Sequence, residues 1–379
     1  MNVRKNKLVS LVALGLTAGL ALTACGGDAE GGSGASDGGG AAAGGSGYAE
    51  LTGNLAGAGA SSMGNAQTAW TESFMGLAGA EGSDVTVTYD PTGSGTGREQ
   101  FLSGQVKFAG TDAALKDEEL ASSAEVCNGE QAFDLPVYIS PIAVVFKLEG
   151  VDTLNLSPEV IGGIFAEDIK TWNDPKIAEL NPDVDLPDTA IVPVHRSDDS
   201  GTTENFTEYL SANAPDAWTH GPIETWPIDG GQSGDGTSGM ISAVEGGEGT
   251  IGYADASQAG NLGTASIKVG EEFVDYSAEA AAKAVDVSPR VEGREDNDIV
   301  MELDRTTTEA GVYPIVLVSY LALCGSYEDA ATGDAVKAYA SYIISEEGQK
   351  VAAESAGSAP ISEELRKDAQ ASIDGIAVG

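Results

Sequence analysis

From Leu51 onward, short runs with the pattern of β-strands alternate with stretches of helical periodicity. The run from Val85 to Tyr89 alternates apolar and polar residues, which is typical of a half-buried strand. Before it, apolar side chains recur at three- and four-residue spacing, which predicts an amphipathic helix through Ala66, Trp70, Phe74 and Leu77. The alternation predicts an α/β fold, and 379 residues suffice for two domains with separate cores.

The same reasoning predicts further elements along the chain. Apolar runs predict strands at 106–109, 133–138, 142–146, 191–194, 250–253 and 313–321. Helical spacing predicts two more helices, through Phe206, Tyr209 and Leu210 and through Val336, Tyr339 and Ile343. Ser157-Pro158 predicts the start of a helix, with the serine as N-cap. The segments 211–227 and 269–297 are less regular, and we assign no element to them.

The first 24 residues have the pattern of a signal peptide. Arg4, Lys5 and Lys7 form a basic region, and an uncharged apolar run extends from Leu8 to Thr23. A membrane-spanning helix is the weaker interpretation, because about 16 apolar residues fall short of the roughly 20 that span a bilayer. We therefore expect an exported protein from which residues 1–24 are removed.

The sequence Leu22-Thr23-Ala24-Cys25 resembles the lipobox of bacterial lipoproteins. It predicts that Cys25 carries a lipid that anchors the protein on the extracytoplasmic face of the cell membrane. Residues 25–48 are rich in Gly, Ala and Ser, bury too little apolar surface to fold, and are expected to form a flexible tether. The alternative is a plain secretory signal followed by a chance cysteine.

The chain is strongly acidic, with a formal net charge of −40 that becomes −43 when the signal segment and its three basic residues are removed. Binding to nucleic acid is therefore excluded, because a phosphate backbone requires basic patches. If the ligand is an anion, local hydrogen-bond donors and dipoles must hold it against an unfavourable overall field.

Two cysteines, Cys127 and Cys324, remain after Cys25. Their even number in an exported chain favours a disulfide between them, because oxidising compartments allow the bond to persist. The alternative is two buried free thiols.

Four short motifs combine glycine with small polar residues where a strand ends or a helix begins: Gly57 to Ser62, Pro91 to Gly97, Gly110 to Asp112, and His195 to Thr202. Glycine lets backbone amides approach a ligand closely, and the first turn of a helix offers unpaired amides at the positive end of its dipole. Hydroxyl groups add neutral donors, and an arginine adds a charged fork. Each motif alone is a common loop or cap, but the four together predict an anion site.

These motifs resemble those of the phosphate-binding proteins of Pst-type ABC transporters, a branch of the two-domain solute-binding proteins. The similarity runs from about Leu55 to Ile361, and its most specific pieces are the opening Gly-Ala-Gly-Ala, the Tyr89 to Gly97 loop, Phe108 to Ala113 and the Arg196 to Thr202 motif. The resemblance implies a type II periplasmic-binding-protein-like fold with two crossovers and a ligand cleft between the domains. We expect domain I at 49–137 plus 311–379 and domain II at 138–310.

The resemblance also implies the ligand residues. The phosphate donors correspond to Ser61, Ser62, Ser94, Arg196, Ser200, Gly201 and Thr202, with Asp112 facing the ligand and Asp198 orienting the arginine. Two departures stand out. Ser61-Ser62 replaces the usual Thr-Phe, so we expect Ser62 to act through its backbone amide. Asp199 stands where glycine is frequent, and we expect it to face solvent.

An acid beside an anion has a chemical reason when the anion is phosphate. Near neutral pH phosphate still carries a proton, and Asp112 can accept a hydrogen bond from it. Sulfate is fully ionised and has no proton to donate, so its oxygen lone pairs would face those of Asp112 at a site without water. Leaving the buried carboxylate without a donor in this way costs roughly 1 to 3 kcal/mol or more of binding free energy. A sulfate- or molybdate-binding relative is the main alternative, and it gives no reason for Asp112.

Two other function classes fit less well. An enzyme acting on phosphate esters needs an activated nucleophile or a metal cage, and His195 and His220 are the only histidines. An adhesin would leave the four donor motifs unexplained. The sequence therefore predicts a monomeric binding protein, without catalytic residues, cofactor or metal, that captures inorganic phosphate and delivers it to the permease and ATPase of an ABC transporter.

Overall fold

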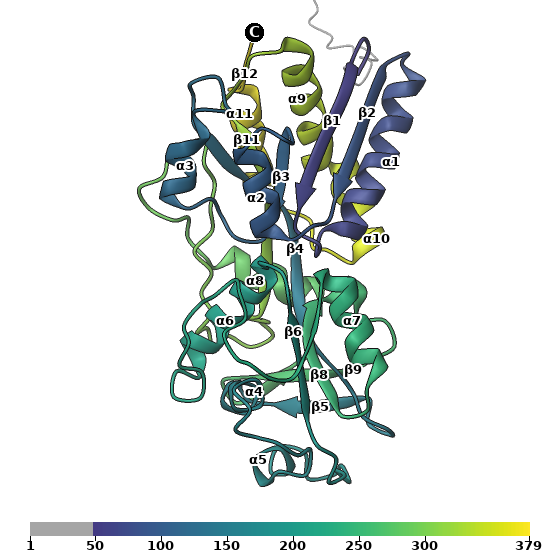
Figure 1. Cartoon of the computed structure of the whole chain (residues 1–379), viewed down its shortest axis with the longest axis vertical. Coiled ribbons are helices and arrows are strands. Elements are labelled where there is room, and N and C mark those ends of the chain that lie inside the picture. The colour runs from purple at the N-terminus through teal and green to yellow at the C-terminus, as the bar shows by residue number, and fades with distance from the viewer. Residues whose placement is uncertain (1–47) are drawn as a thin grey trace, which may run out of the picture. The chain divides into compact units, whose positions relative to one another are not determined.

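The computed structural model describes residues 48–379, and the signal segment, Cys25 and nearly all of the predicted tether lie outside them. Strands are hydrogen-bonded in the order β2-β1-β3-β11-β4-β8-β6-β7 (Figure 1). In the first half of this order, β1 (Thr52–Gly59) pairs in parallel with β2 (Asp84–Asp90) and β3 (Phe108–Thr111). The later strand β11 (Val316–Cys324) runs antiparallel to both β3 and β4 (Ala132–Lys147).

In the second half, β4 continues into antiparallel pairing with β8 (Thr250–Asp255), and β6 (Val192–Arg196) lies parallel between β8 and β7 (Gln232–Gly234). Off this path, β9 (Gly263–Val269) pairs with β4, β5 (Thr153–Leu156) and β10 (Glu272–Val274). A separate two-stranded sheet joins β12 (Ser326–Tyr327) to β13 (Ala377–Val378).

Helices follow most strands. They are α1 (Gly64–Ala80), α2 (Ser94–Leu102), α3 (Asp117–Ser123), α4 (Pro158–Phe165), α5 (Pro175–Ala178), α6 (Gly201–Asn213), α7 (Gly236–Gly246), α8 (Ala278–Asp286), α9 (Ala330–Ile344), α10 (Glu346–Ala356) and α11 (Glu363–Asp374), with a short 3-10 turn η1 (Ala256–Gln258). None of the helices in the described part of the chain is long and apolar enough to span a membrane.

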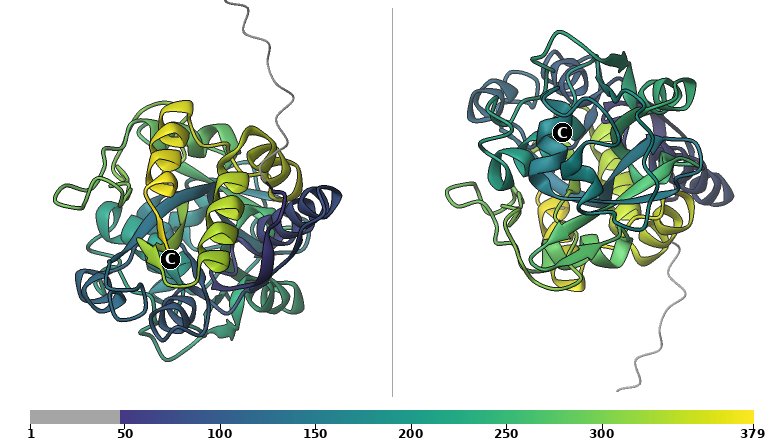
Figure 2. Two further views of the ribbon diagram at one scale, coloured as in Figure 1. Left: turned by 90° about the horizontal axis from the view of Figure 1, so that it is seen from above. Right: turned by 90° about the horizontal axis from the view of Figure 1, so that it is seen from below.

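The buried apolar residues form two clusters, which define two lobes. The first lobe comprises β1, β2, β3, α1, α2, α3 and the C-terminal helices α9, α10 and α11. The second lobe comprises β5, β6, β8, β9, α4, α6 and α7. Figure 2 shows the lobes from their two ends, with the yellow C-terminal helices nearest in one view and teal elements of the second lobe nearest in the other.

The predicted α/β fold is confirmed, and several of its elements lie where the sequence predicts them. Ser157 caps α4 by accepting a hydrogen bond of 3.4 Å from the amide of Val160. The irregular segment 269–297 nevertheless contains β10 and all of α8, and the glycine-rich segment 52–59, for which the sequence predicts no element, is the strand β1.

The strands predicted at 133–138 and 142–146 are one strand, the 16-residue β4. Two prolines suggest a break, yet the pairing with β11 continues past Pro136 to Pro141, and pairing with β8 begins at the next residue, Ile142. Pro136 lies beside a register shift opposite Ser319 and Tyr320, and a bulge is a place where a sheet tolerates proline. As a result, β4 connects the two lobes without interruption.

The chain also passes between the lobes near residue 313, where Val312 lies in the first cluster and Tyr313 in the second. The segment before it is shared, because Ala284 and Ile299 belong to the first cluster although they precede residue 310. The predicted domain boundaries remain a prediction.

A disulfide joins Cys127, which follows α3, to Cys324 at the end of β11, with an S–S distance of 2.03 Å and a sequence separation of 197. Both cysteines are buried in the first cluster. The bond therefore ties the N-terminal part of the first lobe to its C-terminal part.

Candidate functional site

The candidate site lies where parallel strands end and helices begin. In the first lobe, β1 leads into α1, β2 into α2, and β3 ends beside Asp112. In the second lobe, β6 leads into α6 and β7 into α7. The N-termini of α1, α2 and α6 thus carry the predicted hydroxyl and amide donors, α7 begins beside them, and the amides of such first turns attract anions.

Asp112 is the most highly connected residue of this site. Its carboxylate accepts hydrogen bonds from three hydroxyl groups: Ser62 at 2.7 Å to Oδ1 and 2.9 Å to Oδ2, Thr202 at 2.9 Å to Oδ2, and Ser319 at 2.7 Å to Oδ1. Ser62 precedes α1, Ser319 lies in β11, and Thr202 comes across from α6 in the second lobe. The Ser62 hydroxyl has one proton and bonds to one of the two oxygens at a time, so three donors face about four acceptor sites and Asp112 retains room for one more donor.

Burial raises the pKa of Asp112, while the hydroxyls of Ser319, Ser62 and Thr202 and the charge of Arg196 act in the opposite direction. The side chain is 4% exposed. A buried carboxylate of this kind is costly unless it is surrounded by donors, and here each lobe provides at least one of them.

Ser94 and Gly201 meet at the same point from opposite lobes. The backbone amide of Asp112 donates to Ser94 Oγ at 3.1 Å, which leaves the hydroxyl proton of Ser94 free for another acceptor. A Cβ at Gly201 would lie 2.8 Å from both Ser94 Oγ and Asp112 Cβ, so a side chain there would separate the helices. The glycine therefore permits the close approach of α6 to the first lobe.

Arg196, at the end of β6, is held by Asp198. Its Nε donates to Asp198 Oδ1 at 2.7 Å, and its Nη2 donates to Oδ2 of the same carboxylate. The amide of Gly236 at the start of α7 also donates to Asp198 Oδ1, at 3.0 Å. Burial opposes ionisation of Asp198, but these bonds and the charge of Arg196 lower its pKa below the usual value. Asp198 therefore fixes the guanidinium as an ionised partner.

Ser61 joins the first lobe to α7. Its Oγ lies 3.0 Å from Thr237 Oγ1, and the amide of Thr237 donates to it at 3.0 Å. The hydroxyl predicted to bind a ligand thus already contacts a helix N-terminus of the second lobe.

Ser200 and Asp199 begin α6. Ser200 caps the helix by accepting a hydrogen bond from the amide of Thr203 at 3.2 Å. Asp199 is exposed, and its carboxylate accepts a hydrogen bond from Thr225, while its backbone oxygen accepts one from the amide of Gly95 at 3.1 Å. The extra acid therefore does not enter the buried cluster around Asp112.

The structure brings all of the predicted ligand residues within 48–379 to one region, through contacts with Asp112, Asp198 or their helix starts. It also adds Thr237 and Ser319, which sequence reasoning missed. The signal for Thr237 was available, because Gly234-Asp235-Gly236-Thr237 repeats the pattern of the other motifs. Ser319 is a single polar residue in an otherwise apolar strand, which gave no specific signal.

Ser62 has a contact that the sequence does not predict. Its predicted role through the backbone amide stays a prediction, while its hydroxyl is directed at Asp112. Ser62 therefore helps to hold the carboxylate in place as well as offering an amide near the start of α1.

The histidines are placed in an aromatic group rather than in a donor cluster. His195 stacks on Trp226 with ring centroids 5.1 Å apart, and His220 contacts Trp218 edge to face. Among residues 48–379, no group of three or more His, Cys, Asp or Glu side chains is arranged to hold a metal ion. The chemistry of the site is that of neutral donors, one fixed arginine and one buried carboxylate.

Residues 40–347 match the model of a PBP superfamily domain. Phosphate-binding protein PstS 2 of Mycobacterium tuberculosis is 35% identical over 344 residues, which cover 89% of this chain and 89% of that protein. Phosphate-binding protein PstS 3 of Mycobacterium leprae is 34% identical over 336 residues, which cover 86% of this chain and 88% of that protein.

Solved structures share the fold. A high-affinity periplasmic phosphate-binding protein bound with phosphate aligns with a TM-score of 0.67 at 20% identity, over 84% of this chain and 93% of that one. A phosphate-binding protein from Stenotrophomonas maltophilia aligns with a TM-score of 0.62 at 18% identity, again over 84% and 93%.

Proposed function

Because this chain belongs to the PstS family of phosphate-binding proteins, we propose that it binds inorganic phosphate outside the cytoplasm and delivers it to an ABC transporter for uptake. Proteins of this family bind a substrate for transport, and the chain is not an enzyme, as the sequence predicts.

The observation that carries the proposal is the state of Asp112. Three hydroxyl donors occupy its oxygens and leave acceptor capacity for one more donor. Phosphate near neutral pH supplies such a donor through its own proton, whereas sulfate supplies none. The buried carboxylate therefore favours phosphate over sulfate of the same shape.

The remaining ligands in this proposal surround the anion from both lobes. Arg196 supplies the positive charge, and hydroxyls and amides of helix starts supply the neutral donors: Ser61, Ser62, Ser94, Ser200, Gly201 and Thr202. Since both lobes contribute, binding and closure of the lobes are a single equilibrium.

The proposal extends to anchoring and delivery. Cys25 holds the protein to the membrane through a lipid, residues 26–47 serve as the tether, and the monomer presents its closed form to the transmembrane permease. The lipobox pattern and the Gly/Ala/Ser composition support this part.

The test is isothermal calorimetry of residues 48–379 with phosphate and with sulfate at neutral pH. We expect binding of phosphate with one site per chain and far weaker binding of sulfate. Equal affinity for the two anions would favour a general oxyanion-binding protein, and tight binding of sulfate alone would contradict the proposal.

A further inference from the structure

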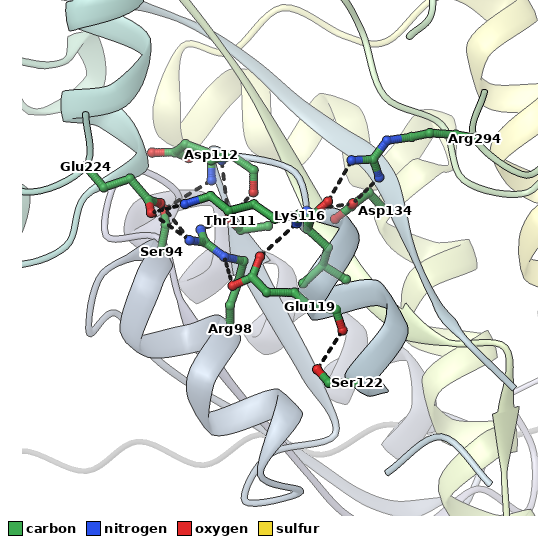
Figure 3. Close-up of polar contacts among 12 residues, drawn as sticks. Ser94, Arg98, Thr111, Asp112, Lys116, Glu119, Ser122, Asp134, Glu224 and Arg294 are labelled. Atoms are coloured by element: carbon green, nitrogen blue, oxygen red, sulfur yellow. Dashed lines mark hydrogen bonds and ion pairs between the residues drawn. The ribbon is translucent and has the colours of Figure 1, made fainter. Parts of the chain in front are cut away.

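A buried ion pair joins the two lobes beside the candidate site (Figure 3). Arg98 in α2 donates from Nη2 to both oxygens of Glu224, at 2.7 and 2.9 Å. Lys116, just before α3, donates to Glu224 Oε2 at 3.1 Å. Glu224 lies between α6 and β7, where its neighbours Ile223 and Trp226 pack against the second cluster. A carboxylate of the second lobe is thus held by two cations of the first.

The other donors of Arg98 are directed within its own lobe. Nε donates to Glu119 at 3.0 Å, and Nη1 donates to Thr111 Oγ1 at 3.1 Å. The arginine side chain is only 3% exposed, so little water reaches it in this arrangement. Arg98 therefore keeps two of its partners when the lobes separate, but the bonds from Nη2 to Glu224 require the lobes to meet.

The backbone of Glu224 is also tied to the candidate site. Its carbonyl accepts a hydrogen bond of 3.2 Å from the amide of Ser200, the residue that caps α6. Arg98 lies in the helix that starts at Ser94. Glu224 therefore connects α2, through Arg98, with the start of α6, and both helices carry proposed phosphate ligands at their N-termini on opposite lobes.

The charge state of the pair is favourable for such a contact. Burial opposes ionisation of Glu224, but the charge and hydrogen bonds of Arg98, together with Lys116, lower its pKa below the usual value. Without the Glu224 carboxylate, the closed form would bury the Arg98 guanidinium with no acceptor for its Nη2, which is energetically costly. In an open form, water would satisfy the same group.

We propose that Glu224 is a positioning residue that holds the lobes together and thereby slows the release of bound phosphate without contacting it. This inference rests on the proposed function, because it concerns the same cleft. The ion pair forms only when the lobes meet, so it stabilises the closed form and any ligand enclosed there. Phosphate enters through the open form and leaves only when the lobes reopen, so the pair changes dissociation much more than association.

The experiment compares Glu224→Gln with the wild type by stopped-flow measurement of phosphate association and dissociation. Glutamine keeps the size but removes the charge, and we expect dissociation to be faster by roughly ten- to a hundredfold with the association rate nearly unchanged. Small-angle scattering of the ligand-free variant should show a larger radius of gyration than that of the wild type, because fewer molecules are closed.

The matched control is Glu119→Gln, which removes the charge of the other carboxylate bound to Arg98. That contact lies within the first lobe and persists when the lobes separate, so its loss affects the open and closed forms equally. The dissociation rate of phosphate should therefore stay within about twofold of the wild-type rate. A third measurement, the thermal unfolding midpoint without phosphate, should be similar for the two variants, which separates loss of the interlobe contact from general destabilisation.

Two outcomes would overturn the inference: wild-type dissociation kinetics in Glu224→Gln, or equal acceleration in Glu224→Gln and Glu119→Gln. Failure of the proposed function is distinguishable from both, because the wild type itself would then show no phosphate binding. The scattering measurement needs no ligand and tests the interlobe contact in either case.

Discussion

Ser319, in the middle of the buried strand β11, donates a hydrogen bond of 2.7 Å to Oδ1 of Asp112. β11 lies between β3 and β4, and its Tyr320 pairs with Thr111 at the end of β3. Ser319 therefore lies next to Asp112, which follows Thr111 in the chain. Its hydroxyl is one of the influences that oppose the rise in the pKa of Asp112 caused by burial. Ser319 thus helps to keep a buried acid ionised.

Ser319→Ala should therefore alter the pH dependence of phosphate binding. Loss of this donor raises the pKa of Asp112 further, so the carboxylate takes up a proton at a higher pH and accepts the ligand's proton less well there. We expect affinity to decline at a higher pH than in the wild type when the pH is lowered from 8 to 5. Calorimetry across this range measures the shift, with Ser372→Ala, a buried serine of α11, as control. Superimposable profiles would remove Ser319 from the site.

Asp112→Asn should change the preference between anions. The substitution replaces a charged acceptor with an amide that also donates, so phosphate should bind more weakly by about 1 to 2 kcal/mol. Sulfate should bind more tightly, because the opposing charge is gone. Competition titration of both anions at fixed pH measures the ratio. An unchanged ratio would mean that Asp112 does not sense the ligand's proton.

Arg196→Ala should weaken both anions together. It removes the fixed guanidinium and leaves Asp198 buried without its partner, a loss of about 2 to 5 kcal/mol for a buried charge pair. The control is Arg290→Ala, which breaks an exposed pair with Asp368. Binding constants for phosphate and sulfate should fall in the first variant and stay constant in the second. Selective loss of one anion would argue against a general charge role for Arg196.

Asp134→Asn tests a second buried acid, away from the proposed ligands. Burial, together with the charge of Asp298, raises the pKa of Asp134 to about 7, even though Arg294 acts in the opposite direction. In the unfolded chain the carboxyl group of Asp134 has a pKa near its ordinary value of 3.8, so between about pH 4 and 7 the folded state holds a proton that the unfolded state has lost. The wild type therefore becomes less stable as pH rises through that window.

Asparagine cannot titrate, so Asp134→Asn should not show this loss of stability. The difference in free energy of unfolding, variant minus wild type, should therefore increase by about 2 kcal/mol between pH 5 and 8. Urea denaturation at several pH values gives the difference, and Asp183→Asn, on an exposed side chain, serves as reference. A constant difference across the range would show that Asp134 titrates normally.

Cys25→Ser tests the anchor. Because the lipobox predicts that lipid attachment depends on this thiol, the variant should leave the membrane fraction and appear as soluble protein outside the cytoplasm. Fractionation followed by carbonate washing provides the measurement. Retention of the variant in washed membranes would contradict the lipoprotein prediction.

The sequence was most informative where local chemistry decides structure. Ser157-Pro158 starts a helix because the cap and the fixed proline backbone act within one turn. The motifs that end at Ser62, Gly97, Asp112 and Thr202 were recognisable for a similar reason: glycine and hydroxyl residues at a helix start have few other uses in combination.

Prediction failed where distant segments decide. β1 consists largely of Gly and Ala and has weak strand propensity, yet Gly57 faces the ring of Phe108 and Gly59 lies against Gly110, where no larger side chain fits. Its identity as a strand therefore depends on two neighbouring strands. The motif that contains Thr237 resembles the others, but it follows β7, a strand of three residues that no periodicity reveals, so the sequence does not mark it as a strand end.

The position of β11 sets the order in which the protein is completed as its chain emerges from the N-terminus. Strands β4 to β10, which build the second lobe, are contiguous between residues 132 and 274. The first lobe starts earlier in the sequence, but β3 and β4 are separated by a gap that only residues 316–324 fill. During synthesis, the first lobe must therefore wait for residues 316–324 to fill the gap between β3 and β4, while strands β5 to β10 of the second lobe are already present.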